Sequence, residues 1–172
     1  MPRPTSVLFV CLGNICRSPL AEGVFIHLAR QRGSEARFRV DSAGTGAWHV
    51  GKRADPRSIA VAQRHGVELP SIARQIDPSA DFADPDDPRV PGFDWFMAMD
   101  HDNAQRLLAL GAAPERVRLL RSFDPLLHAA LPSSPRLEVP DPYYGGESGF
   151  DEVYAMIDRA CRGLLDRLVH PD

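Results

Sequence analysis

An unbroken apolar run near the N-terminus, followed by a short loop and a helix start, constrains this chain more than any other feature. Residues 7–10 read Val-Leu-Phe-Val, which is typical of a strand buried on both faces, as in a parallel sheet under helices. Ser18-Pro19 then predicts a helix start, because proline is tolerated at the first helical position, and Glu22 suits the positive first turn. Residues 11–17 are therefore expected to connect a buried strand to a helix.

This predicted loop carries a cysteine and an arginine. Backbone N–H groups beside a helix N-terminus form a cradle for an anion. Cys11 offers a thiol whose ionised form is favoured there, and Arg17 can grip two phosphate oxygens. Attack of the sulfur on phosphorus would give a phosphocysteine intermediate. The same spacing also occurs by chance, with the cysteine as a small buried hydrophobe, but the order of strand, glycine-containing loop and helix favours catalysis.

Periodicity predicts the remaining elements. Apolar runs indicate further strands, and apolar residues at helical spacing indicate further helices. The strands are expected over residues 38–40, 93–99 and 117–120, and the helices over residues 55–65, 101–110 and 151–169. This alternation indicates the α/β class.

Composition favours one domain and argues against several classes of protein. The 172 residues are 44% hydrophobic, enough for one core, so a single domain over residues 1–172 is expected. The net charge of −3 and the lack of a basic tract argue against nucleic acid or a membrane as partner. An odd number of cysteines, with no signal peptide, predicts a cytoplasmic protein. Scattered histidines predict no metal site and no cofactor.

Two motifs at opposite ends of the chain carry a family resemblance. The run Val-Leu-Phe-Val-Cys-Leu-Gly-Asn-Ile-Cys-Arg-Ser-Pro-Leu-Ala-Glu resembles the signature loop of the low-molecular-weight protein tyrosine phosphatases, and Asp-Pro-Tyr-Tyr-Gly at 141–145 resembles their general-acid segment. The resemblance implies hydrolysis of phosphotyrosine in protein substrates and of small aryl phosphates. It also implies one α/β domain, with a four-stranded parallel sheet, helices on both faces and an N-terminal phosphate-binding loop. We expect a monomer or a weak dimer.

The resemblance implies a role for each catalytic residue. Cys11 is the expected nucleophile and Arg17 the expected phosphate clamp. Asp141 is the expected general acid, since a leaving phenolate needs a proton and a positioned carboxylic acid contributes about 10²–10⁴-fold. It would then act as base on the water that hydrolyses the phosphocysteine. An aspartate before a proline is otherwise a common turn former.

Neighbouring residues are expected to shape and brace the loop. Asn14 tolerates left-handed backbone geometry, and the Ser18 hydroxyl can cap the helix and also donate to the Cys11 sulfur. By resemblance, Ser42 helps to fix the loop from a neighbouring strand. The expected loop and support residues are Leu12, Gly13, Asn14, Ile15, Cys16, Ser18 and Ser42.

Aromatic residues are expected to form the walls of the substrate cleft. By resemblance, Trp48 forms one wall and Tyr143 stands opposite, with Tyr144 beside it, which makes a slot for a phenyl ring. Trp48 could otherwise be a half-buried hydrophobe, and the two tyrosines could be packing residues. In relatives these tyrosines can be phosphorylated, which is a hypothesis for this chain.

Cys16 introduces a prediction about redox control. Relatives can form a reversible disulfide between the positions of Cys11 and Cys16, which protects the nucleophile from deeper oxidation. We therefore predict that a thiol reverses inactivation by peroxide.

Two segments depart from the family pattern. Ser71 stands where many relatives carry a histidine, so the electrostatic contribution of that histidine is not expected here. Residues 83–92 are acidic and proline-rich and look like an insertion, for which we predict a loop without regular structure. A tolerated surface insertion and a role in recognising a partner are both open, and deletion is predicted to leave the turnover of small substrates intact.

Three other functions are alternatives for this sequence. Protein arginine phosphatases resemble this chain but carry threonine at the position of Ile15, where isoleucine favours phosphotyrosine. Arsenate reductases use two further cysteines near the middle of the chain, and none lies between Cys16 and Cys161; Cys161 falls on an apolar helical stripe and is expected in the core. A silent phosphotyrosine-binding module would keep the cradle without turnover, and an assay of phosphate release separates it from an enzyme.

Overall fold

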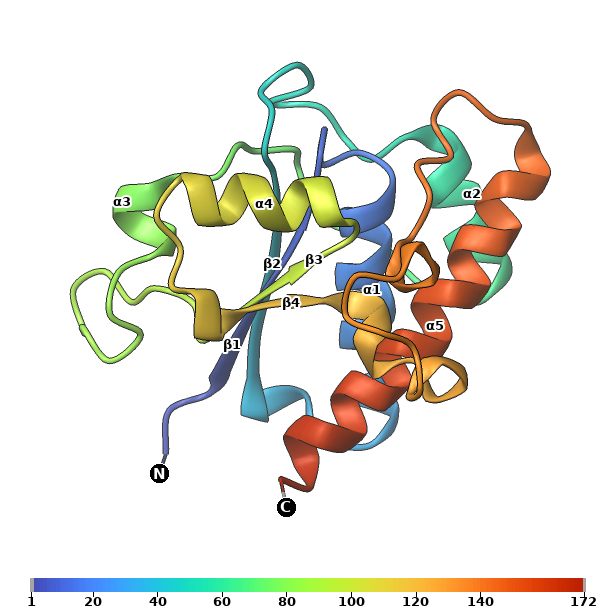
Figure 1. The fold of residues 1–172 in the computed structure, drawn as a ribbon. Helices are drawn as coiled ribbons and strands as arrows, with labels where there is room; N and C mark the ends of the chain where they lie inside the picture. Colours follow the sequence, from blue (N-terminus) through green and yellow to red (C-terminus); the bar gives the residue numbers. More distant parts are fainter. Residues whose placement is uncertain (1, 172) are drawn as a thin grey trace.

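The core of the molecule is a four-stranded parallel sheet (Figure 1). The computed structural model describes residues 2–171. The strands lie in the order β2-β1-β3-β4, with β1 paired to β2 on one side and to β3 on the other. Their bounds are β1 Thr5–Cys11, β2 Phe38–Gly44, β3 Trp95–Ala98 and β4 Val117–Leu119. The predicted sheet is therefore confirmed.

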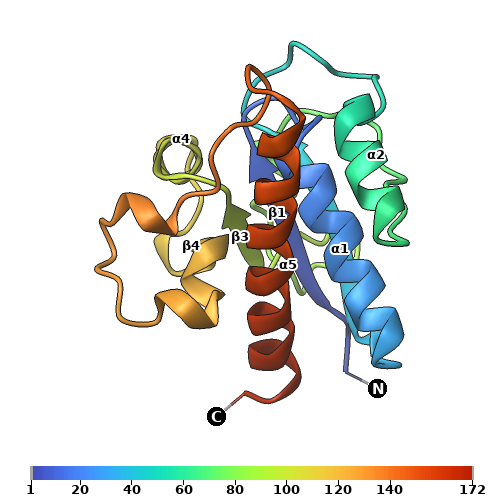
Figure 2. The same cartoon turned by 90° about the vertical axis from the view of Figure 1, so that its right-hand side faces the viewer.

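Helices cover both faces of this sheet. Figure 2 shows α1, α2 and α5 on one face and α4 on the other. The α-helices are α1 Arg17–Gln31, α2 Pro56–Arg64, α3 Pro78–Asp81, α4 His101–Ala109 and α5 Glu147–Val169. Short 3₁₀ helices cover Glu35–Arg37, Pro114–Arg116, Leu120–Phe123, Pro125–Leu127 and Pro135–Leu137. None of the helices within residues 2–171 has both the length and the apolar character required to cross a membrane.

The central strand β1 contributes to two hydrophobic clusters. Side chains alternate along a strand, so Val7, Phe9 and Cys11 join the cluster under α1 and α5, whereas Leu8 and Val10 join the cluster under α4. Residues 7–10 are all 0% exposed, which confirms burial on both faces. Cys11 is the last residue of β1 and lies at the carboxyl edge of the sheet. In open α/β sheets, binding sites occur at this edge where strand order reverses.

The start of α1 differs from the prediction. The helix begins at Arg17, with Cys16 at the N-cap and no side-chain cap, so the expectation that Ser18 caps the helix was wrong. Pro19 is the third helical residue. An N–H there has no intrahelical partner in any helix, so the helix can start two residues before the proline. Ser18 is thereby buried inside the first turn, and its hydroxyl is directed elsewhere.

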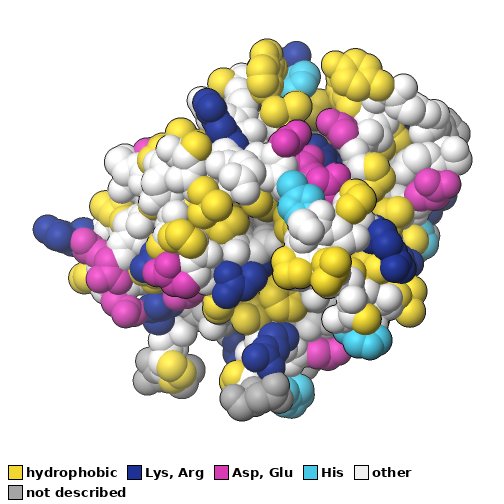
Figure 3. All heavy atoms as spheres, in the orientation of Figure 1, with side chains coloured by type: hydrophobic (Ala, Val, Ile, Leu, Met, Phe, Trp, Pro, Cys, Tyr) yellow, Lys and Arg dark blue, Asp and Glu magenta, His cyan; other side chains and the backbone are white. Residues whose placement is uncertain are grey.

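Residues 83–92 form the predicted loop without helix or strand. Their acidic side chains gather at the left-hand edge of the molecule in Figure 3. Arg3 pairs with Asp86 in this loop and with Asp94 just after it. The two ends of the loop meet, because a Cβ on Gly92 would lie 2.0 Å from the carbonyl oxygen of Ala83. The loop therefore leaves and re-enters the fold at nearly the same point.

Candidate active site

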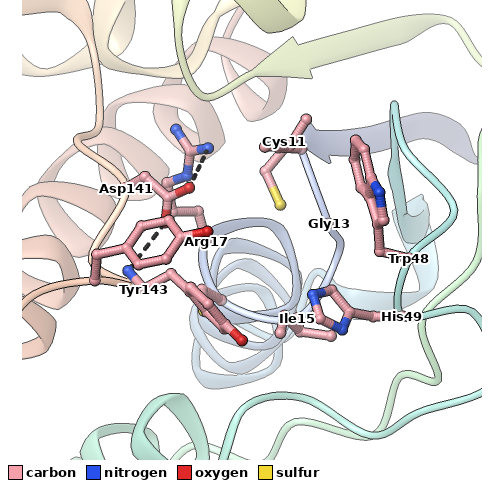
Figure 4. Close-up of a pocket in the computed structure, with 11 residues that line it drawn as sticks. Cys11, Gly13, Ile15, Arg17, Trp48, His49, Asp141 and Tyr143 are labelled. Carbon is pink, nitrogen blue, oxygen red and sulfur yellow. Dashed lines mark hydrogen bonds and ion pairs between the residues drawn. The ribbon is translucent and has the colours of Figure 1, made fainter.

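A cleft of about 340 Å³ opens above the carboxyl end of β1 (Figure 4). Its walls are formed by the loop after β1, the segment after β2 and the segment before α5. The lining residues are Cys11, Leu12, Gly13, Ile15, Cys16, Arg17, Trp48, His49, Asp141, Tyr143 and Tyr144. The fold thus brings together the two motifs that lie at opposite ends of the sequence.

The loop between β1 and α1 is held from outside by its carbonyl groups. A trans peptide directs its C=O and the following N–H to opposite sides. Because the carbonyls point outward to the surrounding residues, the N–H groups that follow them point to the inner side of the loop, as an anion cradle requires. The carbonyls of Cys11, Leu12 and Ile15 accept from the backbone N–H groups of Thr45, Gly46 and Asp55 at 2.9, 2.9 and 2.7 Å, and that of Cys16 accepts from the Ser58 hydroxyl at 3.2 Å.

Asn14 braces the middle of this loop. Its φ of 54° lies in the left-handed region, which asparagine tolerates better than most residues. Its Nδ2 donates to Ser18 Oγ at 2.8 Å and to Ser42 Oγ at 3.0 Å, and its Oδ1 accepts from the Arg74 N–H at 3.0 Å. One buried side chain therefore joins the loop to α1, to β2 and to the segment before α3.

Ser18 connects this network to the Cys11 sulfur. The Ser18 Oγ lies 3.0 Å from Cys11 Sγ. Because Oγ already accepts from Asn14, its own hydrogen is available for the sulfur. The arrangement provides a hydrogen bond that stabilises a thiolate on Cys11.

Glu22 ends the same network on its other side. The sequence pattern assigned Glu22 to the positive first turn of the helix, and this was wrong, since α1 begins at Arg17 and Glu22 lies in its second turn. Glu22 is instead buried, and its Oε2 accepts from Ser42 Oγ at 2.7 Å. Burial raises the pKa of the Glu22 carboxyl, and the hydrogen bond from Ser42 offsets part of this increase.

Arg17 is buried under the cleft and is held by fixed acceptors. Its Nη1 donates to Asp100 Oδ2 at 2.6 Å and to the Val139 carbonyl at 3.0 Å. Asp100 is itself the N-cap of α4, where its Oδ1 accepts from the Asn103 N–H at 2.7 Å. The guanidinium is therefore oriented before any anion arrives, which lowers the entropic cost of binding.

Asp141 faces Arg17 across the cleft. Its Oδ2 lies 3.6 Å from Arg17 Nη2, and its Oδ1 accepts from the Tyr143 N–H at 3.0 Å (Figure 4). The second contact is the ordinary aspartate turn. The turn leaves Oδ2 directed into the cleft, so turn formation and proton transfer are compatible roles for one side chain.

Trp48 and Tyr143 lie on opposite sides of the cleft, with the sulfur of Cys11 between them (Figure 4). Trp48 is 70% exposed, so it is more open to solvent than a half-buried hydrophobe. Its position requires glycine at 46, because a Cβ there would lie 1.8 Å from the indole ring. Tyr144 lies beside Tyr143, with ring centroids 4.9 Å apart.

Residues 6–171 match the family described as low molecular weight phosphotyrosine protein phosphatase. The chain belongs to this family. It is 44% identical over 168 residues to low molecular weight protein-tyrosine phosphatase A of Mycobacterium tuberculosis, a match that covers 96% of this chain and 93% of the relative. It is 38% identical over 166 residues to the human low molecular weight phosphotyrosine protein phosphatase, which covers 94% of each chain.

Solved structures agree with this assignment. A protein tyrosine phosphatase from Entamoeba histolytica superposes with a TM-score of 0.81 at 36% identity, over 96% of this chain and 97% of that chain. A drosophila arginine phosphatase superposes with a TM-score of 0.80 at 30% identity, over 96% and 99%. As a low molecular weight protein tyrosine phosphatase, the protein is a hydrolase.

His49 is a cleft residue of this phosphatase that sequence reasoning did not single out. Its ring centroid lies 6.0 Å from that of Tyr143, so the two rings approach each other across the rim. The only signal in the sequence was its position directly after Trp48. His49 therefore adds a polar ring to the rim of the phosphatase cleft.

The other two cysteines of the phosphatase differ in their surroundings. Cys16 lines the cleft, and burial, with the charge of Asp55 second, raises the pKa of its thiol to about 12. Cys16 is therefore a thiol at neutral pH, which does not favour it over Cys11 for attack on phosphorus. Cys161 is 0% exposed, which confirms the prediction that it lies in the core.

Proposed function

We propose that this phosphatase hydrolyses phosphotyrosine in proteins, and small aryl phosphates, through a phosphocysteine intermediate on Cys11, within one domain of residues 1–172. The observation that carries the proposal is the arrangement of Cys11, Arg17 and Asp141 around one cleft with aromatic walls. Hydrolysis of a phosphate monoester requires a nucleophile, a cation that holds the phosphoryl oxygens and an acid that protonates the leaving group. The sulfur, the guanidinium and the carboxyl group around this cleft are suited to these roles.

The first step transfers the phosphoryl group to sulfur. The Cys11 thiolate attacks phosphorus, the bond between phosphorus and the phenolic oxygen breaks, and the Asp141 carboxylic acid gives its proton to the leaving oxygen. Arg17 and the loop N–H groups hold the phosphoryl oxygens throughout. The phenol departs between Trp48 and Tyr143.

The second step returns the enzyme to its starting state. The Asp141 carboxylate takes a proton from a water molecule, the water oxygen attacks phosphorus, and the bond between phosphorus and sulfur breaks. The Ser18 hydroxyl donates to the departing thiolate of Cys11. Inorganic phosphate and the free thiolate are the products.

Phosphoarginine is the second candidate substrate, because the fold also superposes on a drosophila arginine phosphatase. Ile15 lines the cleft with an apolar side chain, and by family resemblance isoleucine at this position favours phosphotyrosine. The flat walls formed by Trp48 and Tyr143 also suit a phenyl ring, which packs against aromatic faces.

Phosphate release from matched peptides tests the assignment. One peptide carries phosphotyrosine, the other carries phosphoarginine at the same place, and the enzyme is assayed beside Ile15→Thr. We expect a higher kcat/KM for phosphotyrosine and a shift toward phosphoarginine in the variant. A wild type that prefers phosphoarginine would overturn the phosphotyrosine assignment, and failure on both peptides would favour arsenate reduction or a silent binding module. A phosphate adduct on Cys11, seen by intact mass after rapid quenching, tests the intermediate.

Redox control by Cys11 and Cys16 is a further part of this proposal. Both cysteines line one cleft, and a sulfenic acid on Cys11 would condense with the Cys16 thiol with loss of water. A thiol should then reverse inactivation by peroxide, and an irreversible loss of activity would count against the pairing. The cytoplasmic location, the monomeric or weakly dimeric state, the lack of nucleic acid or membrane partners and the phosphorylation of Tyr143 or Tyr144 stay predictions.

A further inference from the structure

Arg57 does not line the cleft, but it is tied to the loop proposed to bind the phosphate. Arg57 is in the first turn of α2, and its Nε and Nη2 donate to Asp55 Oδ1 and Oδ2 at 3.0 and 2.9 Å. The backbone N–H of Asp55 in turn donates to the Ile15 carbonyl of the phosphate-binding loop at 2.7 Å. The guanidinium therefore has a fixed position relative to the phosphate-binding loop.

The other side of the Arg57 guanidinium reaches the segment that carries Asp141. Its Nη2 donates to the Tyr143 carbonyl at 3.1 Å and its Nη1 to the Gly145 carbonyl at 3.5 Å. Its central carbon also lies 5.6 Å from the centroid of the Tyr143 ring. Figure 1 shows this segment, in orange, arching beside the start of α2.

The segment has few other attachments. Residues 140–146 are bonded internally by the turn at Asp141 and by the Gly145 N–H on the Pro142 carbonyl. Among the described residues, their hydrogen bonds to the rest of the molecule come from Arg57 and, at the Gly146 carbonyl, from the Gly149 N–H of α5, and the one ion pair is Asp141 with Arg17. The Tyr143 carbonyl accepts from Arg57, and the Tyr143 N–H donates to Asp141. A single residue, Tyr143, therefore connects Arg57 to the acid through hydrogen bonds.

We propose that Arg57 is a positioning residue for proton transfer, which sets the place of Asp141 over Cys11 by joining the acid segment to the phosphate-binding loop. This inference rests on the proposed role of Asp141 as general acid. Arginine suits the task because its planar fork holds a carboxylate along one edge and carbonyls along another, whereas a lysine offers a single point charge. Losing this connection would displace the acid while leaving the cradle and the nucleophile in place.

Two substrates with different leaving groups test the proposal. Phosphotyrosine releases a phenol with a pKa of about 10, which needs a proton, whereas dinitrophenyl phosphate releases an acidic phenol that departs as the anion. For Arg57→Ala, we expect kcat/KM for phosphotyrosine to fall roughly ten- to hundredfold, because a small displacement of a catalytic group costs up to that much. The kcat/KM for dinitrophenyl phosphate should change by less than about twofold on the same grounds.

Matched variants separate positioning from stability. Arg64→Ala removes another α2 arginine, one that pairs with Asp151 on α5, and should leave both substrates unchanged. Arg57→Lys keeps a positive charge without the fork and should resemble Arg57→Ala, which keeps the test open if the alanine variant folds poorly. Thermal unfolding of each variant is measured beside turnover.

A double-mutant cycle with Asp141→Ala decides the mechanism. If Arg57 acts through Asp141, replacing Arg57 has no further effect on phosphotyrosine turnover once Asp141 is alanine. Equal losses on both substrates, full additivity with Asp141→Ala, or wild-type selectivity in Arg57→Lys would each overturn the proposal. If Asp141→Ala alone leaves phosphotyrosine turnover intact, the general-acid assignment itself fails, and this outcome is distinguishable from the others.

Discussion

The phosphate-binding loop and the segment that carries Asp141 face the same cleft, yet the molecule holds them in different ways. Most of the loop is buried, with Arg17 2% exposed and Asn14 1% exposed, although Leu12 is 45% exposed. Its side chains bond to several separate parts of the fold. The acid segment is open to solvent, with the Asp141 side chain 38% exposed and Tyr144 93% exposed.

This difference separates the two tasks of the enzyme. A buried network of satisfied hydrogen bonds is costly to distort, so the groups proposed to bind the phosphate are organised before the substrate arrives. A segment with few buried contacts opens at a low free-energy cost. Phosphate binding should therefore depend on the core, and proton transfer on a small number of surface contacts.

The largest expected effect comes from the nucleophile. Cys11→Ser should lower kcat by roughly 10⁴-fold or more, since losing the nucleophile removes the covalent route. Because the cradle is built by other residues, the variant should still bind inorganic phosphate. Phosphate release and calorimetry measure the two quantities. Substantial turnover in the serine variant would show that the sulfur is not the nucleophile.

Replacing the acid should damage proton transfer and spare binding. Asp141→Asn should lower kcat/KM for phosphotyrosine by roughly 10²–10⁴-fold. The affinity for inorganic phosphate should be unchanged or slightly higher, because a carboxylate 3.6 Å from Arg17 is lost. Weaker phosphate binding by the variant would contradict the division between the two regions.

Replacing the brace of the loop should affect stability as well as activity. Asn14→Gly keeps the left-handed backbone but removes three hydrogen bonds, so the free energy of unfolding should fall by roughly 2–4 kcal/mol. Asn14→Ala should cost about 1 kcal/mol more, because alanine is strained at positive φ. Urea denaturation measures both. Tyr144→Ala, in the exposed segment, is the control and should change stability by less than about 0.5 kcal/mol.

The buried carboxyl beneath the loop predicts a dependence of stability on pH. The pKa of Glu22 is raised by burial, so the folded state holds this proton more tightly than the unfolded chain. Its contribution to stability is therefore full below the ordinary value of about 4.3 and is lost as the pH rises through the raised pKa. Glu22→Gln removes this loss, so the stability of the variant relative to wild type should increase with pH.

Denaturation at several pH values checks this prediction, with Glu35→Gln as the control. Glu35 is exposed, and its hydrogen bond with Arg30 lowers its pKa, so its contribution is present above the ordinary value and is lost as the pH falls. The two variants should therefore change with pH in opposite directions. A difference between Glu22→Gln and wild type that does not vary with pH would contradict the burial argument.

The smallest effect is expected from the acidic loop. Replacing residues 84–91 by a short glycine-serine turn should change kcat/KM for an aryl phosphate by less than about twofold, because the loop lies away from the cleft and its ends already meet at Ala83 and Gly92. The contact of Arg3 with Asp94 remains in this variant. A well-folded variant with collapsed activity would show that the loop supports the site.

The sequence alone was sufficient for the class of fold, and it indicated most residues of the candidate site. The apolar run at residues 7–10 indicates an inner strand, and a cysteine that ends it before a helix start is expected at the carboxyl edge of the sheet. These are local properties of consecutive residues, as is the turn at Asp141. The motif at residues 141–145 indicated the proposed acid by resemblance, although nothing local placed it near Cys11.

Only the tertiary structure decided the contacts between distant segments. Glu22 looked like a helix-dipole residue and proved to be the buried end of a network through Ser42 and Asn14. Arg57 looked like an ordinary helix arginine and proved to join Asp55 to the acid segment. Such roles depend on which residues become neighbours across the sheet and on how deeply they are buried. Periodicity and spacing report neighbours along the chain, and hydrogen bonds between remote segments leave no periodic signal.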